Sequence, residues 1–353
     1  MDAAMARRSR PQAARTTVKT PKVSVLVPTF NYGRFLGEAV ESVLAQDFQD
    51  FELIIIDDCS ADDTREVAAR FAGRHPLLRF EVNSSNLGMV ANWNRCLAAA
   101  RGDYVKFLFG DDKLAGPTAL GALVSMLDAD EGIVLAASAR AIIDEGSYRI
   151  DQWGPLAAAG RYPGRSTILR CLSRAENMIG EPSAVLFRRD KAGRGFDAEF
   201  QQLVDLEMWF RLLEQGDLAY TPEALCCFRV HSRQQTKANA AHQTGEKEFG
   251  RLLMKLDNPW LWEESSAWQR FRIAHFLRRS ARRARLQEKA PLEMRFRQSV
   301  APLLRPVYWI TGEVVGLCGR LYGSIRKRLR RLFPSAPQRM EWPRNASPPA
   351  RPS

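Results

Sequence analysis

The sequence lacks the patterns that mark several common protein classes. Its six cysteines are scattered, and none forms a C-x-x-C pair or a mixed Cys/His cluster of the kind that holds zinc. Their spacing indicates no disulfide framework, which favours a reducing, cytoplasmic environment. No internal repeat is visible, and no long apolar run follows the arginines near the N-terminus. We therefore expect neither a signal peptide nor an N-terminal anchor.

Two nucleotide-binding loops are also absent after the first predicted strand, residues 23–28. A dinucleotide-dependent dehydrogenase needs G-x-G-x-x-G at this point, where the sequence reads PTFNYGR. A nucleotidyltransferase would need a glycine-rich, basic loop for its triphosphate, and PTFNYGR is a poor substitute. The first absence excludes the dehydrogenase, and the second argues against a nucleotidyltransferase without excluding it.

Positive charge is concentrated at the two ends of the chain. The net charge of the 353 residues is +12, but it is +5 over residues 1–22, −8 over residues 23–250 and +15 over residues 251–353. An acidic middle segment is poorly suited to the phosphodiester backbone, so we expect no nucleic-acid partner. A basic tail suits an anionic membrane surface instead.

Strand patterns alternate with helix patterns between residues 23 and 135. We predict strands over 23–28, 51–58, 78–83 and 103–109, and helices over 37–46, 61–73 and 89–102. The run FELIIIDD is continuously apolar until its end, as is typical of a strand buried on both faces of a parallel sheet. This alternation predicts a doubly wound α/β sheet.

The following segment, residues 140–250, is less periodic. We predict a strand over 184–188, a helix over about 203–215, and a strand that leads into a polar loop at 226–236. Residues 251–333 have helical patterns throughout. The chain from Pro334 onward is rich in proline, serine and arginine, which is typical of disorder.

Polar residues follow three of the predicted strands. The segments PTFN (28–31), DDCS (57–60) and GDD (110–112) each lie just past a strand end. In an open α/β sheet the carboxyl ends of the strands face one ligand crevice, so we expect these segments to meet there. Adjacent carboxylates repel each other, and a bound Mg²⁺ or Mn²⁺ would neutralise the pair in GDD.

These segments also have a simpler structural explanation. Ser60 and Asp63 have the spacing of a helix start, and Gly-Asp is common in turns. A helix start accounts for Asp62 and Asp63. It does not account for Asp57 and Asp58, which end the strand itself.

Four segments, taken in order and with their spacing, resemble glycosyltransferase family 2. They are VSVLVPTFN, FELIIIDDCSADDT, NLGMVANWN and GDYVKFLFGDD, and the resemblance covers about residues 22–236. It implies the GT-A fold, in which a Rossmann-like α/β sheet binds a nucleotide sugar. It also implies an inverting transfer of the sugar to an acceptor hydroxyl. A nucleotidyltransferase of similar fold and a catalytically silent, membrane-associated scaffold are the alternatives.

The resemblance implies roles for individual residues of the loops beyond the strands. The residues that it places around the nucleotide sugar are Pro28, Thr29, Asn31, Asp57, Asp58, Asn86, Gly88, Asn94, Asp111, Glu181 and Arg229. It places Asp112 and His231 on a divalent cation, Mn²⁺ or Mg²⁺, that bridges the diphosphate. Phe109 departs from the family pattern, because many members have a further acid at this position.

The resemblance also implies a general base. In DLEMWFRLL, an acid precedes a helix that carries Trp209 and Arg211, and Asp205 would take the proton of the acceptor hydroxyl. Glu181, in GEPS, is the second candidate. The simpler alternative for Asp205 is an acid at the start of an amphipathic helix.

Residues 305–331 combine an apolar stripe with a basic cluster. Arg305, Glu313 and Arg320 interrupt the apolar run, so we expect that it does not span a bilayer. Its pattern predicts a helix lying on anionic lipid, although the GxxxG spacing would also suit packing against another helix.

These observations predict the following organisation and setting. We expect a disordered basic arm over residues 1–21, a GT-A domain over 22–245, a basic, membrane-associating helical region over 246–333 and a disordered tail over 334–353. The enzyme would lie on the cytoplasmic face of the inner membrane. Its acceptor would be a lipid-linked or polysaccharide glycan.

Overall fold

The computed structural model describes residues 20–76, 78–232, 234, 244–256, 258–284 and 338–339. Nearly all of the expected basic arm and the whole of the expected lipid-binding helix at 305–331 lie outside these residues. Within the described part, no helix combines the length and the apolar composition that crossing a bilayer requires. The described cysteines are free thiols.

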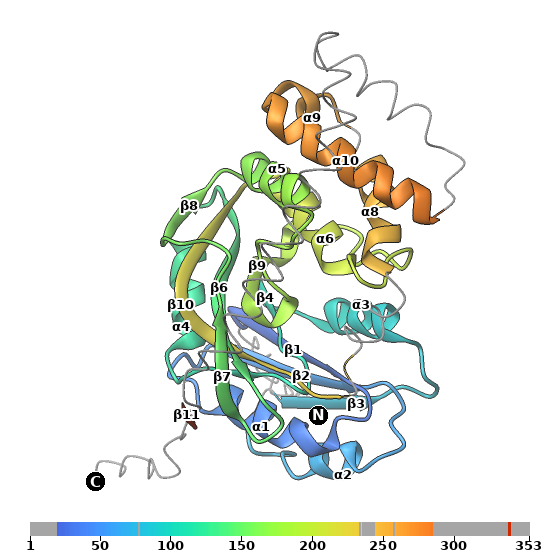
Figure 1. Cartoon of the computed structure of the whole chain (residues 1–353). Coiled ribbons are helices and arrows are strands. Elements are labelled where there is room, and N and C mark those ends of the chain that lie inside the picture. The colour runs from blue at the N-terminus through green and yellow to red at the C-terminus, as the bar shows by residue number, and fades with distance from the viewer. Residues whose placement is uncertain are drawn as a thin grey trace, which may run out of the picture.

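A mixed β-sheet runs through the centre of the described chain (Figure 1). Its parallel part has, in spatial order, β3 (Leu78–Val82), β2 (Phe51–Asp57), β1 (Val23–Thr29) and β4 (Tyr104–Phe107). Beyond β4 the strands are antiparallel, in the order β9 (Val185–Arg188), β6 (Ile133–Ile143) and β7 (Tyr148–Trp153). The predicted parallel sheet is therefore correct up to β4, and the sheet as a whole is mixed.

A long strand, β10 (Asp217–Arg229), returns the chain to the middle of the molecule. It pairs in parallel with β6 and in antiparallel with β8 (Gly160–Tyr162) and β5 (Lys113–Leu114). This strand begins nine residues before the predicted start at 226. Its C-terminal end lies beside β5, directly after the acidic pair of the GDD segment. A short strand, β11 (Gln338–Arg339), pairs with β7.

The two faces of the sheet bury different side chains of the same strands. In β1, Val25 and Val27 pack on one face, and Leu26 packs on the other. The first face is covered by α1 (Gly33–Leu44), α2 (Thr64–Ala69) and α4 (Ala119–Asp128). Every residue of β1 and β2 is buried, as the continuous apolar runs predict.

The second face is covered by a thicker helical layer. This layer contains α3 (Met89–Ala99), α5 (Gly164–Arg174), α6 (Val204–Leu213), α8 (Thr244–Lys255), α9 (Pro259–Glu263) and α10 (Ala267–Ala284). Short 3₁₀ helices, η1 (Pro182–Ala184) and η2 (Arg189–Lys191), flank β9. Helix α10 packs on α5 and α8, above α6 in Figure 1. Leu253 of α8 and Trp209 of α6 belong to one hydrophobic core, so α8 packs directly on the α/β unit.

Helix boundaries differ from the prediction where side chains of neighbouring loops accept hydrogen bonds from the backbone N–H groups at a helix start. Helix α1 begins at Gly33 rather than at residue 37, because Asp62 accepts a hydrogen bond from the Gly33 N–H (3.1 Å). Helix α2 is shorter than the predicted 61–73 and ends in turns before Gly73. The prediction missed β5, α4 and β6, and it also missed β7, β8 and α5, which lie in the less periodic part of the sequence.

Candidate active site

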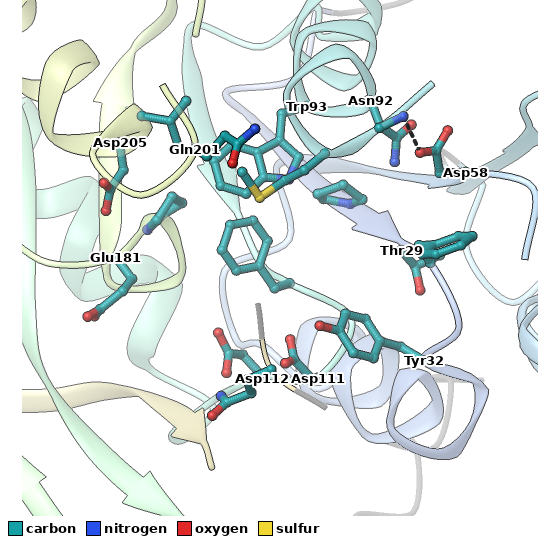
Figure 2. Close-up of a pocket in the computed structure, with 18 of the residues that line it drawn as sticks. Thr29, Tyr32, Asp58, Asn92, Trp93, Asp111, Asp112, Glu181, Gln201 and Asp205 are labelled. Carbon is teal, nitrogen blue, oxygen red and sulfur yellow. Dashed lines mark hydrogen bonds between the residues drawn. The ribbon is translucent and has the colours of Figure 1, made fainter. Parts of the chain in front are cut away.

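A cavity of about 360 Å³ lies at the carboxyl ends of β1, β2 and β4. Its walls come from the loops after these strands, from α3 and η1, and from the segment that leads into α6. The predicted site residues that line it are Pro28, Thr29, Asp58, Asn86, Gly88, Asp111, Asp112, Glu181 and Asp205. In Figure 2, Asp58 and Thr29 lie on one side, Glu181 and Asp205 on the other, and the acidic pair lies between them. The structure thus brings the three predicted strand-end segments together.

Asp58 organises the wall that the resemblance assigns to the nucleotide. Its Oδ1 accepts hydrogen bonds from the Asn83 amide (2.6 Å) and the Leu87 N–H (2.8 Å). Its Oδ2 accepts one from the N–H of Gly88 (2.9 Å). Gly88 has φ of +84°, a conformation that glycine adopts without a steric penalty. The Asn86 amide completes the loop by donating to the Asp58 carbonyl (3.2 Å).

Two predicted nucleotide residues, Asp57 and Asn31, do not line the cavity. Asp57 is fully buried, and its carboxylate accepts hydrogen bonds from the backbone and hydroxyl of Ser60. Asn31 joins the same turn from β1: its N–H donates to the Ser60 hydroxyl (2.8 Å), and its Oδ1 accepts from the Ala61 N–H (2.9 Å). Both residues hold the two strand-end loops together.

Helix α3 presents Asn92 to the cavity and turns Asn94 away from it. The Asn94 side chain both donates to the carbonyl and accepts from the N–H of Phe196, each at 2.8 Å. Asn92 lines the cavity, where its amide donates to the Ile56 carbonyl (3.2 Å) and its Oδ1 accepts from Asn83 (3.0 Å). The two residues are two positions apart and therefore lie on different faces of the helix.

The acidic pair lies at the floor of the cavity and is incompletely neutralised. Asp112 Oδ1 accepts a hydrogen bond from the Arg229 N–H (3.0 Å). Asp112 Oδ2 is buried and has no hydrogen-bond partner within the described part of the chain. Burial and the adjacent Asp111 carboxylate raise the pKa of Asp112. Burial and both carboxylates also raise the pKa of Tyr32, whose side chain lies beside Asp111 (Figure 2).

Arg229 and His231 support this pair from behind rather than line the cavity. Arg229 is fully buried, and its Nε donates to the Asp111 carbonyl (2.8 Å) while Nη1 donates to the Ser147 hydroxyl (2.9 Å). The Nε2 atom of His231 lies 3.0 Å from Asp111 Oδ2. Together they fix the conformation of the GDD segment.

The acidic pair would suit a divalent cation that is held by few protein ligands. The described residues contain no cluster of three or more His, Cys, Asp or Glu side chains placed to bind a metal. The unpartnered oxygen of Asp112, with Asp111 beside it, still suits Mg²⁺ or Mn²⁺, which take one or two carboxylates and otherwise water and phosphate. Phe109 stacks on Trp93, with 4.8 Å between the ring centroids, and adds an apolar surface to the cavity wall.

Asp205 lies in the first turn of α6, on the opposite wall. Its Oδ1 accepts a hydrogen bond from the Leu206 N–H (2.8 Å), and its Oδ2 accepts one from the Asn177 amide (3.1 Å). Burial and the negative charge of Glu181 raise the pKa of Asp205 to about 7. Glu181 forms an ion pair with the buried Arg140. A carboxyl that titrates near neutral pH is suited to exchanging a proton with a hydroxyl.

Several lining residues were not predicted. They are Phe30, Tyr32, Met89, Asn92, Trp93, Phe109, Pro182, Gln201, Gln202, Val204, Phe228 and Gln234. Asn92 and Trp93 belong to the NLGMVANWN segment, so this motif was available as a signal. Gln201 and Gln202 are adjacent amides directly before the helix of Asp205, which is a weaker signal of a polar wall.

Comparison with known proteins identifies the family of this chain. The model of "Glycosyl transferase family 2" matches residues 24–196. The relative named "Putative glycosyltransferase EpsE", from Bacillus subtilis (strain 168), is 30% identical over 220 residues, which are 60% of this chain and 74% of the relative. The chain belongs to glycosyltransferase family 2. As a member, it is an enzyme that transfers a sugar from a nucleotide-sugar donor.

Solved structures show that this family 2 enzyme has the GT-A fold. Residues 1–349 of TarS from S. aureus, solved with UDP-GlcNAc, superpose with a TM-score of 0.57 at 18% identity, covering 82% of this chain and 79% of that one. The mannosyltransferase PcManGT from Pyrobaculum calidifontis, solved with GDP-Man and Mn²⁺, superposes with a TM-score of 0.52 at 20% identity. This match covers 85% of this chain and 88% of the mannosyltransferase. The shared fold includes the mixed sheet described above.

Proposed function

We propose that this family 2 enzyme is an inverting glycosyltransferase that uses Asp205 as its general base and a divalent cation held by Asp112 and Asp111. One observation carries the proposal. The carboxyl groups of Asp58, Asp112 and Asp205 come from separate parts of the chain and line the same cavity. Asp58 would shape the nucleotide loop, Asp112 would face the diphosphate, and Asp205 would take the acceptor proton.

The donor would lie along the wall formed by β1, β2 and α3. The Pro28–Thr29 end of β1 and the loop that Asp58 holds offer backbone and side-chain groups to the nucleotide. Trp93 and Met89 add apolar surface beside them. The diphosphate would then reach Asp111 and Asp112. A cation bound there would supply Lewis-acid stabilisation of the charge on the leaving diphosphate.

The acceptor would enter from the side of Glu181 and Asp205. Ionised Asp205 takes the proton of the acceptor hydroxyl as its oxygen attacks the anomeric carbon. The bond between the anomeric carbon and the diphosphate oxygen breaks, and its electron pair leaves with the nucleoside diphosphate. The attack occurs on the face opposite the leaving group, so the configuration at the anomeric carbon is inverted. The raised pKa of Asp205 makes it a stronger base than an ordinary aspartate.

The acceptor and the cellular site form the finer part of this proposal. We place the enzyme on the cytoplasmic face of the inner membrane, where it would extend a lipid-linked or polysaccharide glycan. The net charge of +15 over residues 251–353 supports an anionic surface as partner. Within the described part, α10 adds Arg272, whose guanidinium lies over the ring of Trp268, and Trp268 is 57% exposed.

A donor panel tests the catalytic part of the proposal. UDP-GlcNAc, GDP-mannose and related donors are screened with Mn²⁺ for protein stabilisation and for released product. Release of nucleoside diphosphate supports a glycosyltransferase, whereas release of pyrophosphate from a nucleoside triphosphate would indicate a nucleotidyltransferase. Neither binding nor turnover of any donor would indicate a silent scaffold.

Flotation with vesicles tests the membrane part. The full chain is compared with a chain that ends after Ala284, which keeps all the described helices. We expect the full chain to float with vesicles rich in anionic lipid and the shorter chain to float less. Equal flotation of the two chains would contradict a membrane role for the tail.

A further inference from the structure

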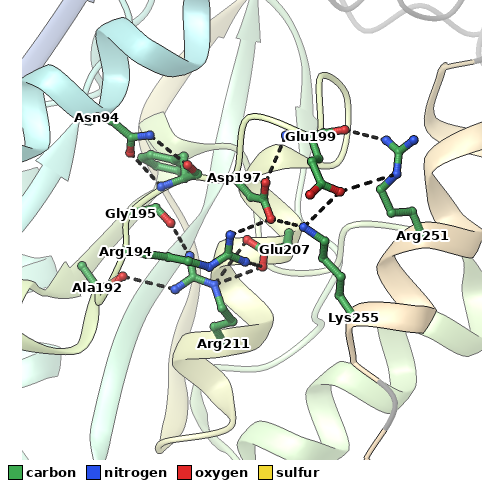
Figure 3. A network of polar contacts seen from close by, with 11 residues as sticks. Asn94, Ala192, Arg194, Gly195, Asp197, Glu199, Glu207, Arg211, Arg251 and Lys255 are labelled. Atoms are coloured by element: carbon green, nitrogen blue, oxygen red, sulfur yellow. Dashed lines mark hydrogen bonds and ion pairs between the residues drawn. The ribbon is translucent and has the colours of Figure 1, made fainter.

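The segment from Ala192 to Leu203 leads into the cavity wall on the side of Asp205 and is held by three helices (Figure 3). Its C-terminal end supplies Gln201 and Gln202 to the cavity and leads into α6, which carries Asp205. Helix α3 holds the segment through the two hydrogen bonds between Asn94 and Phe196. Helix α6 holds it through Arg211, whose Nη1 donates to the Ala192 carbonyl (3.2 Å).

The third anchor comes from α8, beyond the part of the chain that the family model matches. Lys255 forms ion pairs with Asp197 and Glu199, and Arg251 donates to the Glu199 carbonyl (2.6 Å). Arg194 extends this network, because it pairs with both Asp197 and Glu207 of α6 at 2.6 Å. The charged groups of α8 thus contact the segment, and Arg194 of the segment connects it to the helix that follows.

Glu248 makes the closest connection to the cavity. Its Oε1 accepts a hydrogen bond from the N–H of Gln201 (2.8 Å). Its Oε2 accepts hydrogen bonds from the N–H groups of Gln202 (3.0 Å) and Leu203 (2.9 Å). The Glu248 side chain is only 5% exposed. One buried carboxylate therefore satisfies three successive backbone donors immediately before α6.

This arrangement fixes the turn that leads into α6. Leu203 occupies the N-cap position of α6, and no side-chain cap is present there. Glu248 binds the N–H groups of Leu203 and of the two residues before it, not those of the first turn of α6. A negative charge is nevertheless favoured close to a helix start, because the helix dipole is positive at this end. Hydrogen bonds to an ionised acceptor are also stronger than neutral ones. The start of α6 is therefore fixed by a residue that lies far along the chain, in α8.

We propose that α8 completes the active site and that Glu248 is the positioning residue that holds Gln201, Gln202 and the first turn of α6 against the acceptor. The two amides would bind hydroxyl groups of the acceptor, and the fixed helix start would aim Asp205 at the hydroxyl that reacts. This inference rests on the proposed role of Asp205 as the base. It goes further by assigning to α8 a part in acceptor binding.

Hydrogen–deuterium exchange tests the structural half without any substrate. In Glu248→Ala we expect peptides that cover residues 200–206 to exchange about tenfold faster or more, while peptides of β1 and β2 are unchanged. The matched control is Glu264→Ala, which removes an exposed ion pair with Arg165 (2.6 Å) away from the cavity. Unchanged exchange at 200–206 in Glu248→Ala would overturn the inference.

Kinetics with the donor that the wild-type enzyme turns over best test the functional half. For Glu248→Ala we expect kcat to fall about 10- to 100-fold, because small misplacements of reacting groups are costly. The acceptor KM should rise and the donor KM should stay within about twofold. Glu248→Gln keeps only one acceptor oxygen, so its kcat should lie between that of the wild type and that of Glu248→Ala. A fall in kcat that matches the loss of folded protein, with both KM values unchanged, would overturn the inference.

Asp205→Asn, measured in parallel, separates this inference from the proposed function. If Asp205→Asn is inactive and Glu248→Ala keeps wild-type kcat and acceptor KM, only the role of α8 fails. If Asp205→Asn keeps wild-type turnover, the base assignment fails, and with it the aiming of Asp205 by Glu248. The exchange measurement then still decides whether α8 holds the acceptor-side wall.

Discussion

Asp205 illustrates how one residue acquires its chemistry from distant neighbours. Its pKa of about 7 results first from burial and then from the charge of Glu181, which is held by Arg140 from β6. A base must be ionised to accept a proton, and a carboxyl group ionises as the pH rises. We therefore expect transfer, measured as kcat/KM across a pH series, to increase with pH through about 7.

Glu181→Gln tests this origin of the pKa. The substitution removes the like charge and leaves Arg140 to stabilise the Asp205 carboxylate, so the pKa of Asp205 should fall. The acid limb of the kcat/KM profile should move to lower pH by about one unit or more. Asp190→Asn, which changes an exposed carboxyl, is the control. An acid limb that stays in place would show that Glu181 does not set the pKa of the base.

Asp112 is a second residue whose proposed role can be tested, in this case through stability. Its buried, unpartnered oxygen and its charged neighbour destabilise the fold when no cation is bound. In EDTA we expect Asp112→Asn to unfold at the same temperature as wild type or at a higher one. The gain in the free energy of unfolding should be at most about 1 kcal/mol. The stabilisation by Mn²⁺ with nucleoside diphosphate should be lost, and transfer should fall by about 100-fold or more. Thermal unfolding with and without Mn²⁺ checks this, and undiminished stabilisation by Mn²⁺ would contradict it.

At the scale of the element, helix α3 has a binding face and a bracing face. Asn94→Ala would leave the N–H and carbonyl of Phe196 without their partner, at a cost of about 1–3 kcal/mol in stability. The donor KM should change little. Asn86→Ala alters the loop on the cavity side instead and should raise the donor KM several-fold. Urea unfolding and donor titration of both variants check this contrast, and a raised donor KM in Asn94→Ala would contradict it.

At the scale of the whole molecule, the helices after residue 243 complete the fold. Leu252, Leu253, Trp260 and Leu261 are buried in the core that contains Trp209 of α6. A chain ending at residue 243 would expose this core, so we expect it to aggregate or to lack a cooperative unfolding transition. A chain ending after Ala284 should unfold at nearly the wild-type temperature. A soluble, cooperatively folded 1–243 chain would show that α8–α10 are dispensable for folding.

Much of the fold was predictable because buried strands have a characteristic apolar pattern in the sequence. The continuous apolar runs of β1 and β2 predict buried parallel strands, and polar segments just after them predict a site at their carboxyl ends. The predictions missed β7 and β8 because these strands lie in a segment whose pattern follows no single period. The short α2 and the early start of α1 depend on hydrogen bonds between loops, which no local pattern records.

The sequence alone determined the family, the parallel half of the sheet and the acids from which the site is built. Only the tertiary structure decided which of two near neighbours faces the cavity. Asp57 ends β2 and Asp58 follows it directly; successive residues of an extended chain point to opposite sides, so Asp58 lines the cavity while Asp57 braces a turn. Residues two apart on a helix also diverge, which separates Asn92 from Asn94. Contacts such as Glu248 with Gln201 join segments far apart in sequence, and they exist only once the chain has packed.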